Sequence, residues 1–473
     1  MSLPAKNLIV VGQGAAGLTA ALAAAQDARA RGAAVRITLV DKASADEAGG
    51  NTRWSPSNMR MAAPDRIEPS FVHDMLSATQ FQGDETYFAR LAREAPATVQ
   101  WIAAQGIEFI NPPYYLAKGP PRIQPVGGGA AVIKQLALAA TAAGVLFRYG
   151  CAAKSIASEN GRIIGLDVAH GDVHEMMPAD AVILCSGGFE GDGASMREHF
   201  GDGAETMRLI SPGGRFNTGD GIRMALALGA ARSGDWNGMH AEPVDARAKN
   251  SAPVVLVYPY GIVVDKTGRR FFDEGGGLVH ETWEWFARDM QFKTPGRIAF
   301  AILDSRLLAI EGYERAIRSE VPPARAETLA ELATSIGVDP DNLSATVAAY
   351  NAACTGNPEK FDATRCDGLA ASRTLQPPKS NWARAIQEPP YLAYPLVGAV
   401  AYTFGGLATD DCARVQRDGL AIPGLYAAGE ITGHFYATAP NAVSVLRAFV
   451  FGRIAGQQAV SFLSRPDPAV FDG

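Results

Sequence analysis

A change of hydrophobic period over the first forty residues predicts a strand, a tight turn, a helix and a second strand. Residues Leu8–Val11 are continuously apolar, as in a strand that is buried on both faces. A glycine-rich turn follows, and an Ala/Leu-rich stretch then runs to about Arg31 with the composition of a helix. A second apolar run, Val35–Val40, ends at an acidic residue. This order is that of a βαβ unit, and we therefore expect a parallel sheet.

The remaining chain continues to alternate between helical and extended patterns. Helical periodicity is found at 84–105 and 129–143, and a polar segment rich in Gly, Asn and Pro (Gly49–Pro56) precedes both. Extended runs follow at Val145–Tyr149, Ile163–Val168 and Ala181–Cys185. These patterns predict one large α/β domain with a β insertion.

The composition of the sequence changes around residues 213–240, where several Gly-rich turns follow one another. They predict a domain boundary near 236. Residues 254–330 mix short strands with an aromatic-rich stretch, and an amphipathic helical pair follows at about 327–353. Extended runs return near 396–407, and a long helix is predicted at about 441–464.

Composition and charge narrow the classes of function. A chain of 473 residues suggests two or three domains. The 43 basic and 49 acidic residues give a net charge of -6 without any long basic stretch, so nucleic acid is not an expected partner. The apolar run 254–264 is interrupted by Pro259 and is too short for a transmembrane segment.

The cysteines are odd in number, widely spaced and without a CxxC pair. This pattern predicts reduced thiols in a cytoplasmic protein, with no disulfide framework and no zinc or iron–sulfur ligand set. The five residues are Cys151, Cys185, Cys354, Cys366 and Cys412.

The turn after the first strand has the spacing of a dinucleotide-binding motif. Gly12, Gly14 and Gly17 form GxGxxG between a strand and a helix. Such glycines let the backbone turn tightly, let a pyrophosphate approach bare amides and let the helix pack closely on its strand. Asp41, at the end of the second strand, is placed to accept hydrogen bonds from both ribose hydroxyls, and its charge argues against a 2′-phosphate and therefore against NADP.

A second strand–loop–helix near the C-terminus favours FAD over NAD. The segment Gly424–Glu430 ends in a carboxylate that is suited to accept from a ribityl hydroxyl. The last helix begins after Pro440-Asn441, so the free amides around Val443–Val445 and the positive helix end would face the flavin pyrimidine, where charge gathers on reduction. Two dinucleotide-binding halves of this kind are typical of a flavoprotein.

Several segments together resemble the fumarate reductase/succinate dehydrogenase flavoprotein family over nearly the whole chain. They are Gly12–Gly17, Gly49–Thr52, Ala179–Ala181 with Ser186–Gly188, Thr218–Gly221, Gly268–Phe271, Asp273-Glu274 and Gly424–Glu430. Within the family, Pro377–Ala383 and the residues around His240 are most similar to the tricarballylate dehydrogenase branch.

This resemblance implies the fold class and the domain organisation. We expect an α/β architecture in which a Rossmann-like FAD-binding domain is split in sequence (1–235 and 386–473) around an inserted α+β capping domain (236–385). Where membrane-complex members carry a histidine that bonds covalently to FAD, this chain has Asp46-Glu47-Ala48, and so we expect non-covalent FAD. The resemblance assigns cofactor contacts to Gly12, Gly14, Ala15, Ala16, Gly17, Asp41, Lys42, Gly49, Gly50, Asn51, Thr52, Ser186, Gly187, Gly188, Asp220, Gly429, Glu430, Ser444 and Val445.

The resemblance also implies a chemistry in which a hydride moves between a substrate carbon and flavin N5, and a proton moves between the adjacent carbon and an arginine of the cap. Arg288 is the position carried over for that acid/base, with Asp289 and Glu274 as candidates to relay its proton, because arginine alone is a poor acid or base. A surface role for Arg288 in a helix remains the alternative. His240 resembles the histidine that binds a substrate carboxylate, although a structural donor is the alternative; Arg122 either faces the cleft or packs.

Two departures from the family pattern bear on the substrate. Tyr402 stands where the family has a carboxylate-binding histidine, and Ala439–Ala442 replaces an arginine-containing clamp. Arg447 lies further into the helix and does not simply replace that arginine. Because a buried dicarboxylate without cationic partners is costly to desolvate, succinate and fumarate are poor candidates.

Three hypotheses follow for the function: two enzymes with different small-molecule substrates and one protein without a substrate. The first is an oxidoreductase that dehydrogenates a CH–CH bond next to a carboxylate, as in a tricarballylate-like acid, or reduces the alkene. The second acts on a less charged, ketosteroid-type substrate in a cleft with aromatic walls, although such residues also suit a domain core. The third is a flavin-binding redox sensor without substrate chemistry. With no Fe–S cysteine set, electrons would leave to a separate acceptor, namely an Fe–S or quinone-linked protein or oxygen.

Overall fold

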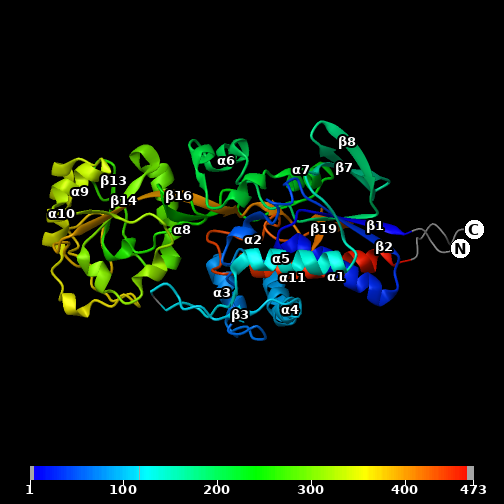
Figure 1. The fold of residues 1–473 in the computed structure, drawn as a ribbon, viewed down its shortest axis with the longest axis horizontal. Helices are drawn as coiled ribbons and strands as arrows, with labels where there is room; N and C mark the ends of the chain where they lie inside the picture. Colours follow the sequence, from blue (N-terminus) through cyan, green and yellow to red (C-terminus); the bar gives the residue numbers. More distant parts are fainter. Residues whose placement is uncertain (1–4, 117, 466–473) are drawn as a thin grey trace, which may run out of the picture.

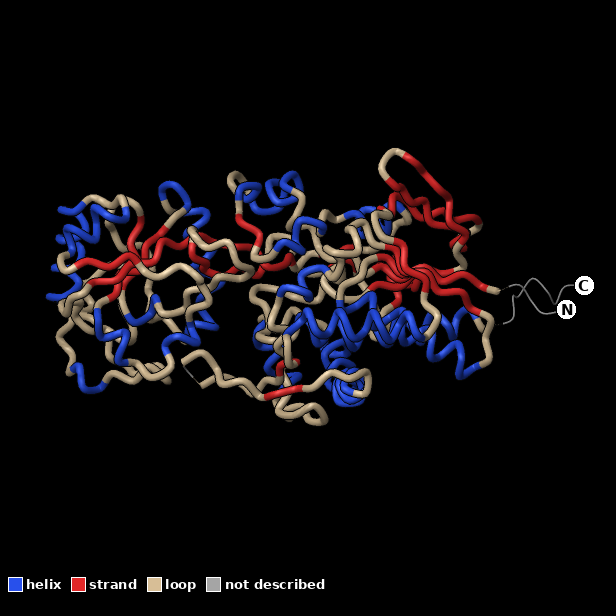
Figure 2. The backbone as a smooth tube through the Cα atoms, in the orientation of Figure 1, coloured by secondary structure: helices blue, strands red, loops and turns tan. Residues whose placement is uncertain are grey.

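The protein is built around two six-stranded sheets and was analysed as a computed structural model that describes residues 5–116 and 118–465. Figure 1 shows the two parts side by side, with the chain returning from the second part to the first through β16 (Tyr391–Thr403). Figure 2 shows one group of strands at the right of the molecule and another that extends from its left end towards the centre. Among the described residues, no helix is both long and apolar enough to cross a membrane.

The first sheet carries the predicted βαβ unit. The strands β19, β9, β1, β2 and β5 are parallel, and β18 is added antiparallel at one edge. In spatial order the strands are β18 (Arg414–Arg417), β19 (Leu420–Ala427), β9 (Ala181–Leu184), β1 (Lys6–Val11), β2 (Val35–Val40) and β5 (Leu146–Arg148).

Alternation along β1 places its side chains on both faces of this sheet. Leu8 and Val10 pack in a core with the helices α1 (Ala15–Arg31) and α11 (Ser444–Leu463), whereas Ile9 and Val11 pack in a second core under a three-stranded sheet. That sheet consists of β6 (Ala152–Glu159), β7 (Arg162–His170) and β8 (Val173–Pro178). Figure 1 shows α1, α5 and α11 on one side of β1 and β2, and β7 and β8 on the other.

The second sheet is organised around the long strand β16. It pairs with β10 (Arg208–Leu209), β12 (Met239–Asp245), β14 (Ala299–Leu303) and β15 (Ala324–Ala326), and β14 in turn pairs with β13 (Ile262–Asp265). The strand β16 lies after residue 385, where the inserted domain was predicted to end. It nevertheless pairs with strands from within 236–385, so the two parts of the molecule share this element. The domain boundaries at 235/236 and 385/386 stay predictions.

Helices cover both sheets. Beyond α1 and α11 they are α2 (Gly50–Trp54), α3 (Phe71–Ala78), α4 (Glu85–Ala103), α5 (Gly128–Ala142), α6 (Gly193–Phe200), α7 (Asp220–Ala227), α8 (Val279–Lys293), α9 (Leu329–Ile336) and α10 (Pro340–Ala353). Two short pairs complete the strands, β3 (Phe109–Ile110) with β4 (Gln124–Pro125) and β11 (Arg232–Ser233) with β17 (Gly406–Leu407).

Two segments to which the sequence pattern assigned no secondary structure contain helices. The polar segment Gly49–Pro56 contains the short helix α2. The aromatic-rich stretch within 254–330 is the helix α8, which buries Trp283 and Phe286 against the second sheet. Its buried apolar residues follow the helical period and form one face of the helix: Val279, Trp283, Phe286, Ala287 and Met290.

Candidate active site

One cavity is lined from both sheets. Its walls come from the turn after β1, the end of β2, α2, the loop after β9 and the start of α11 on one side, and from β12, β16 and α8 on the other. Since parallel strands end at the same edge of a sheet, the ends of β1, β2 and β9 open together at this cavity.

Two glycines of the turn, Gly12 and Gly14, lie in the wall of the cavity. Gly12 has a φ of 101°, which glycine adopts without strain, and Gly14 borders the cavity with no side chain. Gly17 does not line the cavity; an added Cβ would lie 1.8 Å from the carbonyl oxygen of Gly12, so this glycine permits close packing of α1 on β1. The N-cap residue Gly14 has no side chain to cap α1. The amide of Ala15 donates to Oγ1 of Thr52 (3.3 Å), and the positive end of this helix favours an anion in the cavity.

Asp41 closes β2 at the cavity. Its two carboxylate oxygens accept hydrogen bonds from the amides of Gln13 (2.7 Å) and Ala43 (2.8 Å), and burial raises the pKa of the carboxyl group. Next to it, Lys42 donates to Asp220 at 2.7 Å. Burial acts to raise the pKa of Asp220, but Lys42, Thr218 and Arg223 together outweigh it and the pKa is lowered. All three predicted contacts line the cavity.

The helix α2 and the loop after β9 form a further part of the wall. Gly50, Asn51 and Thr52 line the cavity, as do Ser186 and Gly187. Gly49 and Gly188 do not line it and have packing roles: Gly49 has a φ of 128°, and a Cβ on Gly188 would lie 2.3 Å from a carboxylate oxygen of Glu430.

Glu430 lies beside a second buried carboxyl group. Asn217 donates one amide nitrogen to Glu190 (2.7 Å) and to Glu430 (3.2 Å), and the amide of Thr403 donates to Glu430 at 3.2 Å. Burial and the charge of Glu430 raise the pKa of Glu190 well above its usual range. Glu430 and Gly429 line the cavity, which fits the predicted contact with a ribityl hydroxyl.

The start of α11 contributes Ser444 and Val445 to the wall, and also Arg447. The Arg447 side chain is fully buried and donates only to the carbonyl of Thr432 (3.2 Å); its Nε and one Nη have no partner among the described residues. The guanidinium lies 3.9 Å from the ring centre of Phe435. Our sequence reasoning excluded this arginine as a direct replacement for the family clamp, yet the structure brings it to the cavity.

His240 and Tyr402 meet at the end of the cavity formed by the second sheet. They are opposite each other in the β12–β16 pairing, and their rings stack with centres 4.9 Å apart. The two ring nitrogens of His240 contact Glu284 (Nδ1, 2.9 Å) and Glu242 (Nε2, 3.1 Å). With both nitrogens engaged, no ring N–H is left for the substrate carboxylate that we expected His240 to bind.

Charges around His240 decide its protonation state. Burial alone would lower the pKa of the imidazole, but the hydrogen bonds and charges of Glu242 and Glu284 raise it to about 9. Burial raises the pKa of the Tyr402 phenol, which therefore stays protonated. This end of the cavity thus holds a histidine cation between two carboxylates, with a neutral phenol beside it.

Aromatic rings connect His240 to Arg122. The ring of Trp283 lies 5.9 Å from His240 and 5.9 Å from Tyr115, and the guanidinium of Arg122 lies 4.9 Å from the ring centre of Tyr115. Arg122 is 6% exposed and donates to the carbonyl of Pro113, while its Nε has no partner among the described residues. Of the two roles left open for Arg122, the structure supports the one in the cleft.

Arg288 and Asp289 are not brought to the cavity. Arg288 donates to the carbonyl of Asn237 (3.2 Å) and lies over the ring of Trp285, and Asp289 pairs with Lys293 one turn along α8. These contacts are those of the surface alternative weighed for Arg288. The acid/base role expected for Arg288 therefore has no support in this geometry.

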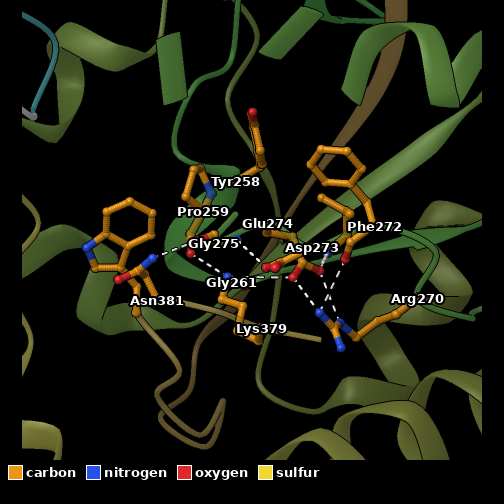
Figure 3. Close-up of polar contacts among 12 residues, drawn as sticks. Tyr258, Pro259, Gly261, Arg270, Phe272, Asp273, Glu274, Gly275, Lys379 and Asn381 are labelled. Carbon is orange, nitrogen blue, oxygen red and sulfur yellow. Dashed lines mark hydrogen bonds and ion pairs between the residues drawn. The ribbon is translucent and has the colours of Figure 1, made fainter. Parts of the chain in front are cut away.

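Glu274, the other relay candidate, belongs to a separate buried cluster. Figure 3 shows Arg270 and Lys379 converging on Glu274. Arg270 donates to both carboxylate oxygens, and Lys379 lies 3.7 Å away and donates to the carbonyls of Pro259 and Gly261. Burial lowers the pKa of Lys379 to about 8. With its partners in place, Glu274 has a structural role and does not reach Arg288.

The residues present fit FAD. The glycine turn and the N-terminal end of α1 face the cavity where a pyrophosphate would bind. The carboxylate of Asp41, at the end of β2, lies in the same wall, where the motif places the ribose. Two arginines with unpartnered donors line the same cavity, and buried donors of this kind need an anionic or carbonyl partner. The predicted contacts in the wall stay assignments by position, and non-covalent attachment stays a prediction.

Glu242 and Glu284 were missed by the sequence reasoning. Glu242 has a local signal, because residues i and i+2 of a strand share a face, which places it beside His240. Glu284 has none, since 44 residues separate it from His240 and its position depends on how α8 packs on β12.

Comparisons with known proteins identify the family and the fold of the chain. The chain matches the FAD binding domain family over residues 7–443. Probable fumarate reductase Ifc3 of Shewanella frigidimarina is 28% identical over 96% of this chain and 74% of its own length. A 3-oxosteroid 1-dehydrogenase of Mycobacterium tuberculosis is 30% identical over 82% of this chain and 72% of its own.

Among solved structures, the open conformation of a flavocytochrome c3 fumarate reductase is similar, with a TM-score of 0.76 and 25% identity; the match covers 98% of this chain and 79% of that chain. The predicted fold class, an α/β FAD-binding fold with a capping domain, is confirmed. The relatives are FAD-dependent dehydrogenases and reductases, which favours the enzyme over the non-catalytic sensor. The chain belongs to the FAD binding domain family, is similar to the fumarate reductase flavoproteins, and is an FAD-dependent oxidoreductase that acts on CH–CH groups.

Proposed function

We propose that the enzyme dehydrogenates a CH–CH bond next to a carboxylate, in a tricarballylate-like acid, or reduces the corresponding alkene. When bound, FAD supplies the hydride acceptor or donor for one of the two carbons. The chain's own residues bind the acid, orient it, exclude water and handle the proton of the other carbon. The resemblance to the tricarballylate dehydrogenase branch belongs to this proposal.

The observation that carries the proposal is the buried guanidinium of Arg122 in the cavity wall, whose Nε has no partner among the described residues and which pairs with no carboxylate there. A buried arginine without a carboxylate partner is costly, and a substrate carboxylate would supply both the charge and the acceptor that it lacks. Arg318 lines the same cavity and lies 5.8 Å from the ring of Tyr115, the ring that Arg122 also contacts. Two cations thus face the place where an acid would bind.

The aromatic side chains between Arg122 and His240 set the orientation. With the carboxylate at Arg122, the reacting carbons would lie along Trp283 and Tyr115 and towards Tyr402. A substrate that fills the cavity against these rings would displace water and so strengthen each electrostatic contact inside it.

A separate electron acceptor is part of the proposal. All five cysteines are free thiols and do not form a ligand set, so electrons would pass to an Fe–S or quinone-linked protein or to oxygen.

A ketosteroid-type substrate is the second candidate. The aromatic walls and the neutral phenol of Tyr402 suit a less charged ketone, and the 3-oxosteroid 1-dehydrogenase is among the relatives.

An anaerobic titration of the FAD absorption band separates the two candidates. We expect tricarballylate to bleach the wild-type enzyme, and we expect Arg122→Met to raise the concentration needed at least tenfold. A saturated 3-ketosteroid that bleaches the flavin equally well in wild type and Arg122→Met, while the acids do nothing, would establish the second candidate instead.

A further inference from the structure

Three ionisable side chains from two elements form a continuous chain from the cavity into the protein. Glu242 and His240 both line the cavity and contact each other. Glu284, on α8, contacts the other ring nitrogen of His240 and does not line the cavity. The exposed fractions of the side chains decrease in the same order, 19%, 11% and 5%. The three side chains thus connect the cavity, where a substrate would bind, to the buried carboxylate of Glu284.

The backbone fixes this order. A register shift between His240 and Ala241 interrupts the β12–β16 pairing, so that His240 is opposite Tyr402 and Ala241 is opposite Val400. Such irregularities in a ladder re-aim side chains and are common next to active sites. His240 and Glu242, two positions apart, share the face of β12 that borders the cavity.

The titratable groups that face the imidazole come from three elements. Glu242 lies on its own strand, Glu284 on α8 and the neutral Tyr402 on β16. Arg447 on α11 acts on the neighbouring Tyr402. One oxygen of Glu284 is buried without a partner among the described residues, so this carboxylate is held for the histidine alone. The set carries two negative charges and one proton-dependent positive charge.

The proposed function needs a group that exchanges a proton with the carbon next to the acyl group. Arg288 lies outside the cavity, and Tyr402 is a weak acid held neutral by burial. A carboxylate in the cavity wall, beside a histidine that supplies or removes the proton, meets the requirement.

We propose that Glu242 is the catalytic residue that exchanges this proton, with His240 as the proton reservoir behind it and Glu284 as the positioning residue; the inference rests on the proposed function. In the dehydrogenation direction the C–H bond next to the acyl group breaks and its proton goes to Glu242. The electron pair of that bond becomes the new C=C bond while the hydride of the neighbouring carbon leaves to FAD. In the reverse direction Glu242 returns the proton and His240 replaces it.

The test compares single-turnover bleaching of the holoenzyme by tricarballylate, succinate and a saturated 3-ketosteroid in wild type, Glu242→Gln and Glu284→Gln. The matched control is Glu314→Gln, an exposed glutamate remote in sequence from these three residues. We expect Glu242→Gln to keep bound FAD and to slow bleaching at least 100-fold, and the control to behave as wild type.

A second readout follows the imidazole itself by nitrogen NMR of the holoenzyme. We expect His240 to titrate near pH 9 in the wild type and at lower pH in Glu284→Gln, and the pH at which alkene reduction falls to half to move by the same amount. A merely structural Glu284 would change stability without moving that midpoint.

The outcomes separate the two proposals. Wild-type bleaching that persists at the normal rate in Glu242→Gln would overturn the proton assignment alone, as would a rate midpoint that does not follow the His240 titration. No bleaching of the wild type by any of the three compounds would overturn the proposed function, and this assignment with it.

Discussion

The Nδ1 of His240 donates to Oε2 of Glu284 at 2.9 Å, which joins strand β12 to helix α8 through a buried ion pair. The same ring contacts Glu242 through its other nitrogen. As a result, the pKa of this histidine is about 9 in the folded protein, against about 6.5 for an unperturbed histidine. A raised folded-state pKa links the stability of the protein to pH.

This shift predicts the pH dependence of stability. Between pH 6.5 and 9 the folded state binds more protons at His240 than the unfolded state, so the contribution is complete below 6.5 and is lost as the pH rises to 9. The free energy of unfolding of the wild type relative to His240→Gln should fall by about 3 kcal/mol over this window. Denaturant unfolding at a series of pH values measures it, and the exposed His174→Gln serves as the control. A difference that stays constant across the window would contradict the assigned charge state.

Two glycines of the same turn should behave differently. In Gly17→Ala the new Cβ would overlap the backbone oxygen of Gly12, and we expect a loss of about 2–3 kcal/mol in unfolding free energy. In Gly14→Ala the nearest neighbours are 4.0 Å away, so the fold should be retained while the methyl group enters the cavity and weakens FAD binding. Thermal unfolding of the apoproteins and FAD titrations distinguish the two effects. Equal stability of both variants would argue against the close packing of α1 on β1.

Asp41→Ala should release FAD. The carboxylate fixes the turn through the amides of Gln13 and Ala43 and lines the cavity, and we expect the dissociation constant for FAD to rise at least tenfold. Fluorescence of free FAD on dilution measures the constant. Asp27→Ala, which removes only an ion pair within α1, is the control and should bind FAD as the wild type does. Retention of full affinity in Asp41→Ala would place the ribose elsewhere.

Glu274→Gln should destabilise the part of the molecule that is built around the β16 sheet. The change leaves Arg270 and Lys379 buried without their carboxylate, and breaking a buried pair in this way costs about 3–5 kcal/mol. Chemical denaturation measures the cost, and Glu281→Gln on the nearby helix is the control. If the loss is no larger than in the control, the cluster is not the structural element that its burial indicates.

The sequence predicted the cofactor end of the site, because residues close together in the chain form it. The turn Gly12–Gly17 and Asp41 belong to one βαβ unit whose geometry is set by neighbouring residues, and Glu430 follows a strand of the same sheet. The structure places the turn's first two glycines and both carboxylates in the wall of one cavity, and their contacts with FAD stay predictions.

The substrate end could not be predicted in the same way. The partners of His240 come from the packing of α8 on β12, and the position of Arg288 depends on which face of α8 is buried. Phe286 and Ala287 are buried while Arg288 turns towards the Asn237 carbonyl, a one-residue difference in helix phase that the sequence pattern does not fix. The position of Arg447 could not be predicted either, because its burial depends on contacts with Thr432 and Phe435.

The most direct test of the central claim is the visible spectrum of the purified protein under anaerobic conditions, before and after the addition of tricarballylate. We predict a bound FAD band that persists through gel filtration and bleaches when the acid is added. A protein that binds no flavin even after reconstitution with FAD would contradict the assignment of the cavity, and with it the function proposed for the enzyme.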